Sequence, residues 1–214
     1  MRKFDTKVQK LKYKVLREIA RQAWEDSLPA GALSVPEKLA PGDEATKRCC
    51  VYKERAILAQ RVKLAMGGSS SNSNVVEVID IACDECPVGG YTVTDACRGC
   101  IAHRCESACP KGAITFDNQL KAGIDRSKCI ECGRCAAVCP YSAINHRVRP
   151  CEASCKLKAI SVTRDGDDDD KSAVIDNDKC ISCGACIYHC PFGAISDKSY
   201  IVNVIDILKK SLGG

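Results

Sequence analysis

The sequence is poor in aromatic side chains and has no long apolar run. It contains 1 Trp, 6 Tyr and 3 Phe, but 18 Cys, in 214 residues. No apolar stretch approaches the ~20 residues that a membrane-spanning helix needs. The first thirty residues also lack the apolar core and small-residue cleavage site of a secretory leader. We therefore expect a cytoplasmic protein without a membrane segment. Because thiols are kept reduced in that compartment, the cysteines are expected to bind metal rather than form disulfides.

The basic excess of the chain is confined to its N-terminal third. The formal net charge is +5, but residues 1–66 carry 15 Lys and Arg against 8 Asp and Glu, whereas residues 67–214 carry 17 against 19. Aromatic residues interleaved with the basic ones, which would stack on bases, are missing. We therefore expect the basic helices to be solvated faces or docking surfaces, with no nucleic-acid partner.

Periodicity and turn residues divide the chain into a helical part and a cysteine-rich part. Apolar spacing predicts amphipathic helices over 5–26 and 50–66, and a last helix over 200–210. The run GGSSSNSN at 67–74 predicts a flexible surface linker. The run DDDDK at 167–171 predicts a solvated loop. Strands are predicted over 75–81, 113–116, 122–125, 160–163, 173–176 and 194–196.

The cysteine-rich part contains an internal repeat. CIECGRCAAVCPYSAI (129–144) and CISCGACIYHCPFGAI (180–195) match at 9 of 16 positions with an offset of 51. CESACPKGAI (105–114) and CEASCKLKAI (151–160) match at an offset of 46. The difference of five equals the length of the DDDDK run, which places an insertion in the second copy. Two copies of one module are therefore expected.

Each copy contains a full C-x2-C-x2-C-x3-C-P run, the first from Cys129 to Pro140 and the second from Cys180 to Pro191. This is the run with which bacterial ferredoxins hold four-iron clusters, and its fourth cysteine serves the neighbouring cluster. Gly133 and Gly184 each follow the second cysteine of a run, where they allow the backbone to approach the cluster closely. Zinc would more often show isolated C-x2-C pairs.

Crossing the fourth ligands between paired runs assigns three clusters. A longer run, C-x2-C-x4-C-x3-C-P, precedes the first full run and completes a two-cluster module with it. The second module lacks the partners of Cys97 and Cys100, since Ala143 and His146 stand there. The predicted ligand sets are Cys97, Cys100, Cys105 and Cys139 for cluster 1, Cys129, Cys132, Cys135 and Cys109 for cluster 2, and Cys180, Cys183, Cys186 and Cys155 for cluster 3.

Two half-sites remain after this assignment. One is the upstream pair Cys83 and Cys86, and the other consists of Cys151 and Cys190. Together they make four ligands, and four clusters would use 16 of the 18 cysteines. We hypothesise that these residues hold cluster 4, so that the chain carries four [4Fe-4S] clusters, and at least three.

A few other residues could also act as metal ligands. His146 is an alternative ligand to a cysteine, although a lone exposed histidine is usually only solvated. His103 and His189 are expected to be ordinary loop residues. Vicinal thiols bind one metal poorly, so Cys49 and Cys50 are expected to be buried free thiols. A radical-SAM signature and a phosphate-binding glycine loop are absent from the sequence, and no nucleophile and base stand out as a catalytic pair.

Over about residues 97–196 the chain resembles bacterial ferredoxins, and a longer resemblance covers most of the chain apart from 67–74 and 165–172. KYKVLREIARQAWE (12–25), RCCVYKERAI (48–57), EVIDIACDECP (77–87), TVTDACRGCIAHRCESACP (92–110) and CISCGACIYHCPFGAISDKS (180–199) are similar to the N-terminal, cluster-bearing region of group B iron-only hydrogenases. In that family the region relays electrons between a soluble carrier and a catalytic domain that holds the H-cluster. No position here matches an H-cluster ligand, so the chain alone is not expected to make or oxidise hydrogen.

The expected fold is α+β, with an N-terminal helical segment followed by two tandem bacterial-ferredoxin-like modules. The expected domains are a helical segment at 1–66, the linker at 67–74, module 1 at 75–150, module 2 at 151–199 and a C-terminal helix at 200–214. The expected function is transfer of single low-potential electrons, with a hydrogenase-type catalytic domain or subunit and a soluble ferredoxin as partners. A standalone polyferredoxin is the alternative, and a zinc-stabilised nucleic-acid-binding module is a remote one.

Overall fold

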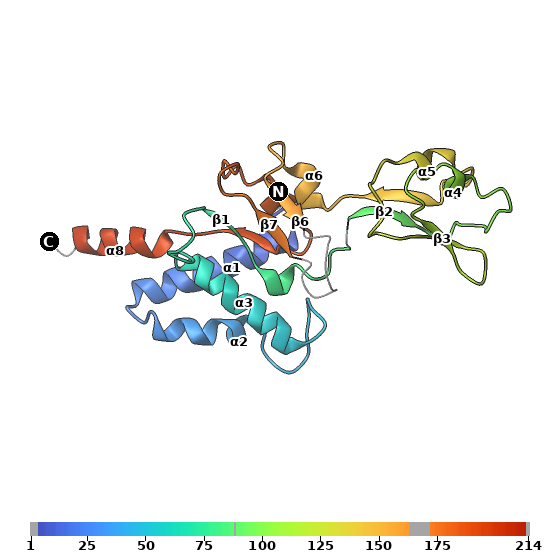
Figure 1. The fold of residues 1–214 in the computed structure, drawn as a ribbon. Coiled ribbons are helices and arrows are strands. Elements are labelled where there is room, and N and C mark those ends of the chain that lie inside the picture. The colour runs from blue at the N-terminus through green and yellow to red at the C-terminus, as the bar shows by residue number, and fades with distance from the viewer. Residues whose placement is uncertain (1–3, 88, 163–171, 213–214) are drawn as a thin grey trace. The chain divides into compact units, whose positions relative to one another are not determined.

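A computed structural model describes residues 4–87, 89–162 and 172–212 of the chain (Figure 1). The loop predicted at 167–171 lies outside the described residues. The chain forms two compact units. Unit 1 comprises Met1–Glu85, Pro150–Ser161 and Ser172–Gly214, and unit 2 comprises Cys86–Arg149 and Val162–Lys171. Most of unit 2 is therefore inserted, in sequence, between two parts of unit 1.

The long helices all belong to unit 1. They are α1 (Lys7–Trp24), α3 (Val51–Ala65) and α8 (Ile201–Leu212), and all three were predicted to within two residues at each end. The Thr6 side chain caps α1 by accepting a hydrogen bond from the Gln9 N–H. A short 3₁₀ helix (Ala30–Ser34) and α2 (Val35–Leu39), which the sequence analysis missed, fill the connection between α1 and α3.

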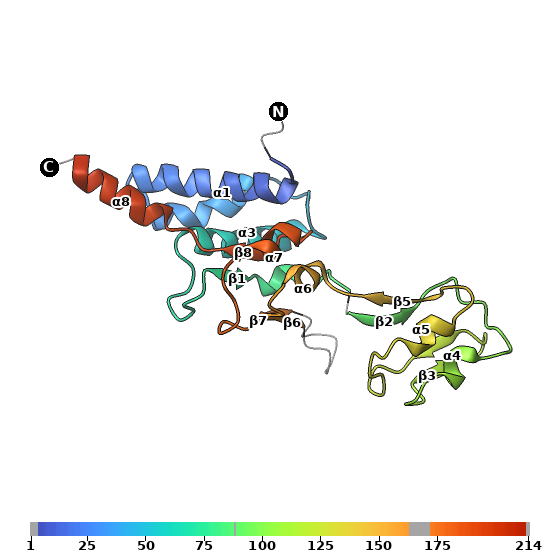
Figure 2. The same cartoon turned by 90° about the horizontal axis from the view of Figure 1, so that it is seen from above.

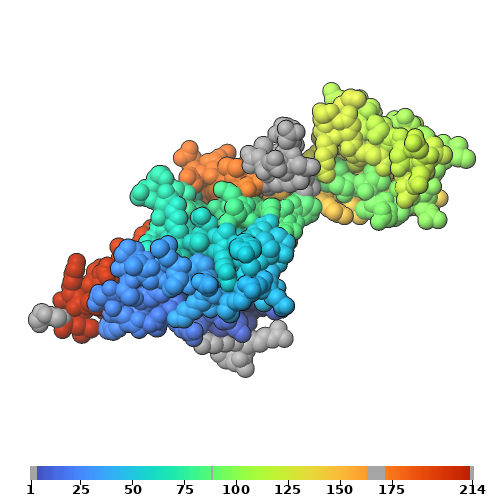
Figure 3. All heavy atoms as spheres, turned by 90° about the horizontal axis from the view of Figure 1, so that it is seen from below, coloured from blue at the N-terminus to red at the C-terminus, as the bar shows by residue number. Residues whose placement is uncertain are grey.

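An aliphatic core fastens these helices together. The helices α1 and α3 pack against each other and against α2, and α8 packs along α1 (Figure 2). The space-filling view shows the red side chains of α8 at the surface beside the blue residues of the N-terminal helices (Figure 3). The buried residues of this core contain no cysteine; they are Val15, Ile19, Ala32, Val35, Ala40, Leu58, Val62 and Ala65.

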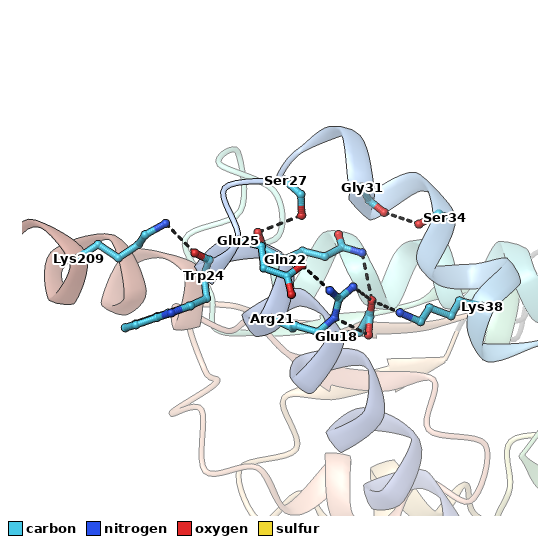
Figure 4. A network of polar contacts seen from close by, with 10 residues as sticks. All are labelled: Glu18, Arg21, Gln22, Trp24, Glu25, Ser27, Gly31, Ser34, Lys38 and Lys209. Atoms are coloured by element: carbon cyan, nitrogen blue, oxygen red, sulfur yellow. Dashed lines mark hydrogen bonds and ion pairs between the residues drawn. The ribbon is translucent and has the colours of Figure 1, made fainter.

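A polar network lies against this core at the end of α1 (Figure 4). The carboxylate of Glu18, whose side chain is 8% exposed, accepts hydrogen bonds from Arg21 and Lys38 at 2.7 Å each. The Arg21 guanidinium is the main cause that lowers the pKa of Glu18 to about 2, and Lys38 adds to it, against the effect of burial. From α8, the Lys209 ammonium donates to the carbonyl of Trp24 at 2.9 Å. The network therefore ties α1, α2 and α8 together.

The strands are short and form pairs. The pairs are β1 (Val76–Val78) with β8 (Ile195–Asp197), β2 (Gly90–Val93) with β5 (Ile144–Arg147), β3 (Ile114–Phe116) with β4 (Ala122–Ile124), and β6 (Ile160–Val162) with β7 (Ala173–Ile175). The first three pairs are antiparallel. Five of the six predicted strands are confirmed, and the sixth, 75–81, is a three-residue strand followed by a 3₁₀ turn at Asp80–Ala82. The strands β2 and β5 were not predicted.

The strand pairs of the two copies correspond, but in the second copy one strand pairs with a segment from before the first copy. The hairpin β3–β4 corresponds to β6–β7, and β5 corresponds to β8 at the offset of 51. The partner of β5 is β2, which lies in the same module, whereas the partner of β8 is β1, which precedes the whole first module. The second copy therefore takes its outer strand from residues 76–78, and in the sequence the first copy lies between this strand and the rest of the second copy.

The segment predicted as a flexible linker is hydrogen-bonded at several points. The buried ammonium of Lys198 donates to the carbonyls of Ser69 and Asn72 and pairs with Glu77 at 3.0 Å. The buried Asn74 accepts a hydrogen bond from the Ser182 hydroxyl at 2.8 Å. These contacts attach 67–74 to the second copy, and its flexibility stays a prediction.

Four short helices follow the ligand loops: α4 (Arg104–Ser107), α5 (Arg134–Val138), α6 (Pro150–Ser154) and α7 (Ala185–His189). In the part of the chain that the structure describes, no helix combines the length and the apolar character that crossing a bilayer requires.

Candidate metal centres

The structure describes all 18 cysteines, and none of them forms a disulfide. The predicted ligands gather in groups within the loops between the strand pairs. Six of them are buried, namely Cys83, Cys86, Cys135, Cys151, Cys186 and Cys190. Among the described residues, no three Cys, His, Asp or Glu side chains are placed to hold a single metal ion.

The four predicted ligands of cluster 3 line one cavity of unit 1. Its volume is about 410 Å³, and its walls are otherwise mostly apolar, with Ile160 and Ile175 among them. Burial raises the pKa of the Cys186 thiol, and the neighbouring thiols of Cys180 and Cys183 raise it further. The sulfur atoms that line this cavity are Cys155, Cys180, Cys183 and Cys186.

A smaller cavity of unit 2 is lined by the four predicted ligands of cluster 2. It lies under Tyr91 and beside Gly133, with Cys109, Cys129, Cys132 and Cys135 in its wall. Burial raises the pKa of the Cys135 thiol, to which Cys129 and Cys109 contribute. The presence of Cys109 in this group agrees with the crossed fourth ligand, since Cys109 belongs to the other run.

The predicted ligands of cluster 1 all lie in unit 2, and Cys97, Cys105 and Cys139 pack against the same buried core. Burial raises the pKa of Cys105, and the thiols of Cys100 and Cys139 contribute to the rise. Cys139 comes from the full run, and Cys100 and Cys105 come from the longer one. The sulfur of Cys97 accepts a hydrogen bond from the N–H of Ala122 on β4 at 3.4 Å.

One local turn recurs after the last cysteine of each run. The residue three positions after that cysteine has a positive φ, at Gly112, Ser142, Lys158 and Gly193. This turn brings the N–H of the next residue back to the cysteine sulfur. The donors and acceptors are Ala113 to Cys109 (3.2 Å), Ala143 to Cys139 (3.4 Å), Ala159 to Cys155 (3.2 Å) and Ala194 to Cys190 (3.2 Å).

These amide donors were missed in the sequence analysis, although all four segments read Cys-x3-Ala-Ile. The N–H of Ala113 is the main cause that lowers the pKa of Cys109. Hydrogen bonds from backbone N–H groups to sulfur favour the thiolate, the form that binds iron. The predicted close-approach glycines, Gly133 and Gly184, both have φ near +77° and start α5 and α7. Gly133 is fixed there, because a Cβ would lie 2.5 Å from the Tyr91 hydroxyl.

Cys83 occupies in the second copy the place that Cys97 has in the first. The N–H of Ala173, the first residue of β7, donates to the Cys83 sulfur at 3.4 Å. Ala173 is the repeat partner of Ala122, which donates to Cys97. The backbone agrees, since Thr94 before Cys97 donates to the Ala143 carbonyl, and Ile79 before Cys83 donates to the Ala194 carbonyl. The pair Cys83 and Cys86 thus follows β1 as Cys97 and Cys100 follow β2.

Cys86 is the first residue of unit 2, and a buried arginine holds its backbone. Arg149 is 2% exposed, and its guanidinium donates to the carbonyls of Pro87 at 3.2 Å and Cys86 at 3.4 Å. Arg149 lies two residues before Cys151. The C-x2-C loop is therefore fastened to the segment that leads into another predicted ligand of cluster 4.

The three histidines make ordinary contacts. His146 is exposed, stacks near Tyr91 and lies 3.6 Å from the Glu131 carboxylate. His103 stacks on Phe116 at 3.8 Å between ring centroids, and His189 meets Tyr188 edge to face.

The expectation that Cys49 and Cys50 are buried is wrong, because both are exposed. They precede α3, and the Cys50 sulfur caps that helix by accepting a hydrogen bond from the Lys53 N–H at 3.4 Å. A small side chain at an N-cap position lies outside the helix it caps, which accounts for the exposure.

The 4Fe-4S dicluster domain family matches this chain twice. One dicluster model covers residues 121–191 and a second covers 96–143. Together they span both full cysteine runs and the longer run that precedes them.

Several curated proteins are similar to parts of this chain. A "Ferredoxin 7Fe" from Hydrogenibacillus schlegelii is 41% identical over 26% of this chain and 70% of its own length. One component of the Na(+)-translocating ferredoxin:NAD(+) oxidoreductase complex of Acetobacterium woodii is 32% identical over 47% of this chain and 38% of that component. The electron transport protein HydN of Escherichia coli is 35% identical over 29% of this chain and 37% of its own length. The chain thus spans less than two fifths of the length of the last two.

The cysteine groups, the repeated strand pairs and these matches define a protein with 4Fe-4S dicluster domains. The chain belongs to the ferredoxin family. It is an iron–sulfur electron carrier that binds several [4Fe-4S] clusters, as the sequence analysis predicted. The iron chemistry of the matched domains favours this interpretation over the zinc alternative.

Proposed function

We propose that this protein relays single low-potential electrons through four [4Fe-4S] clusters to or from a hydrogenase-type catalytic domain in the cytoplasm. Each cluster, when bound, takes up and gives back one electron. The chain itself fixes the sulfur positions, supplies backbone N–H groups to the thiolates and covers the sites with apolar side chains. The proposed ligand sets are Cys97, Cys100, Cys105 and Cys139; Cys129, Cys132, Cys135 and Cys109; Cys180, Cys183, Cys186 and Cys155; and Cys83, Cys86, Cys151 and Cys190.

The hydrogen bond from Ala173 to the Cys83 sulfur is the observation that supports a fourth cluster. It gives Cys83 the environment that Ala122 gives to Cys97, in a repeat that otherwise lacks a first C-x2-C pair. Iron and acid-labile sulfide on anaerobically purified protein test the count. About sixteen of each per chain would support four clusters of four irons, whereas about twelve would remove cluster 4 from the proposal.

A basic stripe on α1 supports docking of an acidic electron carrier such as a soluble ferredoxin. Lys7, Lys10, Lys14 and Arg17 are exposed and recur at helical spacing, and they line an open groove with Phe4 and Tyr13. Positive charge on one face steers an acidic partner and speeds its association in low salt.

Charge reversal tests this surface. The double variant Lys10→Glu and Lys14→Glu should slow reduction by an acidic ferredoxin about tenfold or more in low salt, because like charges then face each other. Added salt should reduce the difference from the wild type. The matched control reverses two exposed lysines of unit 2, Lys111 and Lys121. Equal slowing by both double variants, or no salt dependence, would remove α1 as the docking surface.

An exposed apolar face on α8 supports a catalytic partner rather than a standalone carrier. Ile205 is buried, whereas Val204, Ile207, Leu208 and Leu212 are exposed in the described part of unit 1. Contiguous exposed apolar residues on a helix are typical of an interaction surface. Hydrogen evolution by a separately produced group B catalytic domain, supplied with electrons through the reduced chain, tests the pairing. We expect turnover with the wild type and a severalfold loss with Ile207→Ser and Leu212→Ser. If turnover is the same without the chain, the standalone polyferredoxin replaces this proposal.

A further inference from the structure

Arg61 on α3 is a buried cation that has no carboxylate beside it among the described residues. It is 6% exposed, and its guanidinium donates through Nη2 to the Gly193 carbonyl at 2.6 Å. Its Nε is buried and has no hydrogen-bond partner in the described part of the chain. Burial of an uncompensated charge is costly, so a negative group must lie nearby in the functional protein.

Arg61 and Cys190 line the same cavity of unit 1. Burial is the main cause that lowers the pKa of Arg61 to about 10, and the positive charge of Arg48 lowers it too, whereas Cys190 raises it. Gly193 lies three residues after Cys190 and has a φ of +60°. A Cβ at Gly193 would lie 2.6 Å from the Arg61 Nη2, so the glycine is what lets the guanidinium reach this turn.

Arg48 joins the two backbone segments that carry Cys83 and Cys190. Its guanidinium donates to the carbonyl of Ala82 at 3.2 Å and to that of Phe192 at 3.3 Å, and it lies over the Phe192 ring. Asp84 and Glu85 are also close to Cys83 in sequence, but they are exposed, and Lys53 pairs with both. Lys53 compensates much of the charge of these two carboxylates, and Arg48 also interacts with Asp84. Arg61 is therefore the less compensated of the two arginines.

We propose that Arg61, aided by Arg48, raises the reduction potential of the [4Fe-4S] cluster held by Cys83, Cys86, Cys151 and Cys190, so that it is more readily reduced than the two clusters of the first copy. This inference rests on the fourth cluster of the proposed function. One electron enters at reduction and no bond forms or breaks, so that the charge of the cluster with its thiolates changes from about −2 to about −3. A positive charge in a buried place stabilises the more negative state.

Among the described residues of the first copy's ligand loops, no arginine is buried as Arg61 is. The buried arginine of unit 2, Arg149, contacts the backbone of Cys86, which belongs to the same proposed cluster 4. The arginines within its ligand loops, Arg98, Arg104 and Arg134, are exposed, so solvent screens their charges. At Gly112, which occupies the same turn after the last cysteine of its own run, the space that a Cβ would take is open. The two arginines come from the N-terminal helical segment, which gives that segment a role in setting the direction of electron flow within the chain.

An anaerobic redox titration followed by electron paramagnetic resonance tests the proposal. The Cys83→Ser variant first identifies the signal of cluster 4 as the one that it removes. Arg61→Met should then shift the midpoint potential of that signal by at least about 59 mV to more negative values. For one electron this is a tenfold change in the ratio of reduced to oxidised cluster. Arg61→Lys, which keeps the charge, should retain most of the wild-type midpoint.

Controls separate charge from general damage. Lys63→Met removes an exposed charge from the same helix and should leave all four midpoints unchanged. Arg48→Gln provides a second variant if Arg61→Met loses iron, and should shift the same signal in the same direction. The proposal is overturned if the cluster 4 midpoint stays unchanged in Arg61→Met and Arg48→Gln at full iron content. A wild-type iron content of about twelve would instead overturn the fourth cluster, and this inference with it.

Discussion

The two copies of the cluster-binding module use the same local turns but different surroundings. In the first copy, within unit 2, the strand β2 and the pair Cys97 and Cys100 directly precede the rest of the module in the sequence. In the second copy, β1 and Cys83 come from upstream of the whole first copy. A strand from upstream thus brings a C-x2-C pair to the edge at which the second copy has none of its own.

The two copies also differ in what packs beside them. In unit 2 the apolar core is built largely around cysteines, with Cys135 buried and Cys97, Cys105, Cys109 and Cys139 packed against it. Unit 1 adds a separate aliphatic core of helices that contains no cysteine. Stability that depends on iron should therefore be concentrated in unit 2, whereas unit 1 has helical packing of its own.

The sharpest test of the comparison is to remove the corresponding cysteine from each copy. Cys83→Ser and Cys97→Ser should each lower the iron content by about four atoms per chain, because each sulfur is proposed to hold one corner of one cluster. Iron and sulfide analysis with electron paramagnetic resonance checks both. We expect the two variants to remove different signals. If Cys83→Ser keeps the wild-type iron content while Cys97→Ser loses four, the correspondence between the copies fails.

A smaller effect is expected from the two glycines that occupy the turn after the last cysteine of a run. Gly112 and Gly193 both have positive φ, so alanine at either costs about 1 kcal/mol of backbone strain. Ser142 and Lys158 occupy the same turn in the other runs, so this strain is tolerated. At Gly193 the new Cβ would also lie 2.6 Å from both Arg61 and Val8, which adds about 1–3 kcal/mol of overpacking.

Thermal loss of the cluster absorbance measures this difference. Gly193→Ala should lose colour at a clearly lower temperature than Gly112→Ala, which should stay close to the wild type. Equal midpoints for the two variants would mean that the contact between Arg61 and the turn after Cys190 contributes little.

The spacing of cysteines and apolar residues was sufficient to predict the elements that depend only on neighbouring residues in the sequence. The C-x2-C-x2-C runs specify their own loops, and the amphipathic spacing of 5–26 and 50–66 specifies α1 and α3, so these elements were predicted closely. Pairing of β1 with β8 depends on residues more than a hundred positions apart, and no local pattern encodes it. The sequence analysis therefore expected two modules in tandem, and only the structure revealed that β1 pairs with β8.

The arginines illustrate a second limit. Arg61 lies on the apolar stripe of α3, between Leu58 and Ala65, and a cation in such a stripe is a signal that the sequence analysis could have used. What it could not supply is the acceptor, since the Gly193 carbonyl is 132 positions away. The expectation that Cys49 and Cys50 are buried was wrong, because composition alone does not tell a buried thiol from one that caps a helix.

The smallest expected effect concerns the helical core that unit 2 lacks. Glu18→Gln removes the charge that Arg21 and Lys38 contact at 2.7 Å, which should lower the stability of the helical part by about 1–2 kcal/mol without changing the iron content. Because the pKa of Glu18 is lowered to about 2 from an ordinary 4.5, its contribution is complete above about pH 5 and is lost as the pH falls from 4.5 toward 2.

Urea unfolding followed by the fluorescence of Trp24, the single tryptophan, measures this contribution beside the network. The gap between wild type and Glu18→Gln should be constant from pH 7 to pH 5 and should shrink below pH 4.5. Acid damage to the clusters affects both proteins alike and cancels in the difference. Glu25→Gln, an exposed partner of Arg21, is the matched control and should change little. A gap as large at pH 3 as at pH 7 would show that the amide disturbs packing, and that the charge of Glu18 is not what ties α1 to α2.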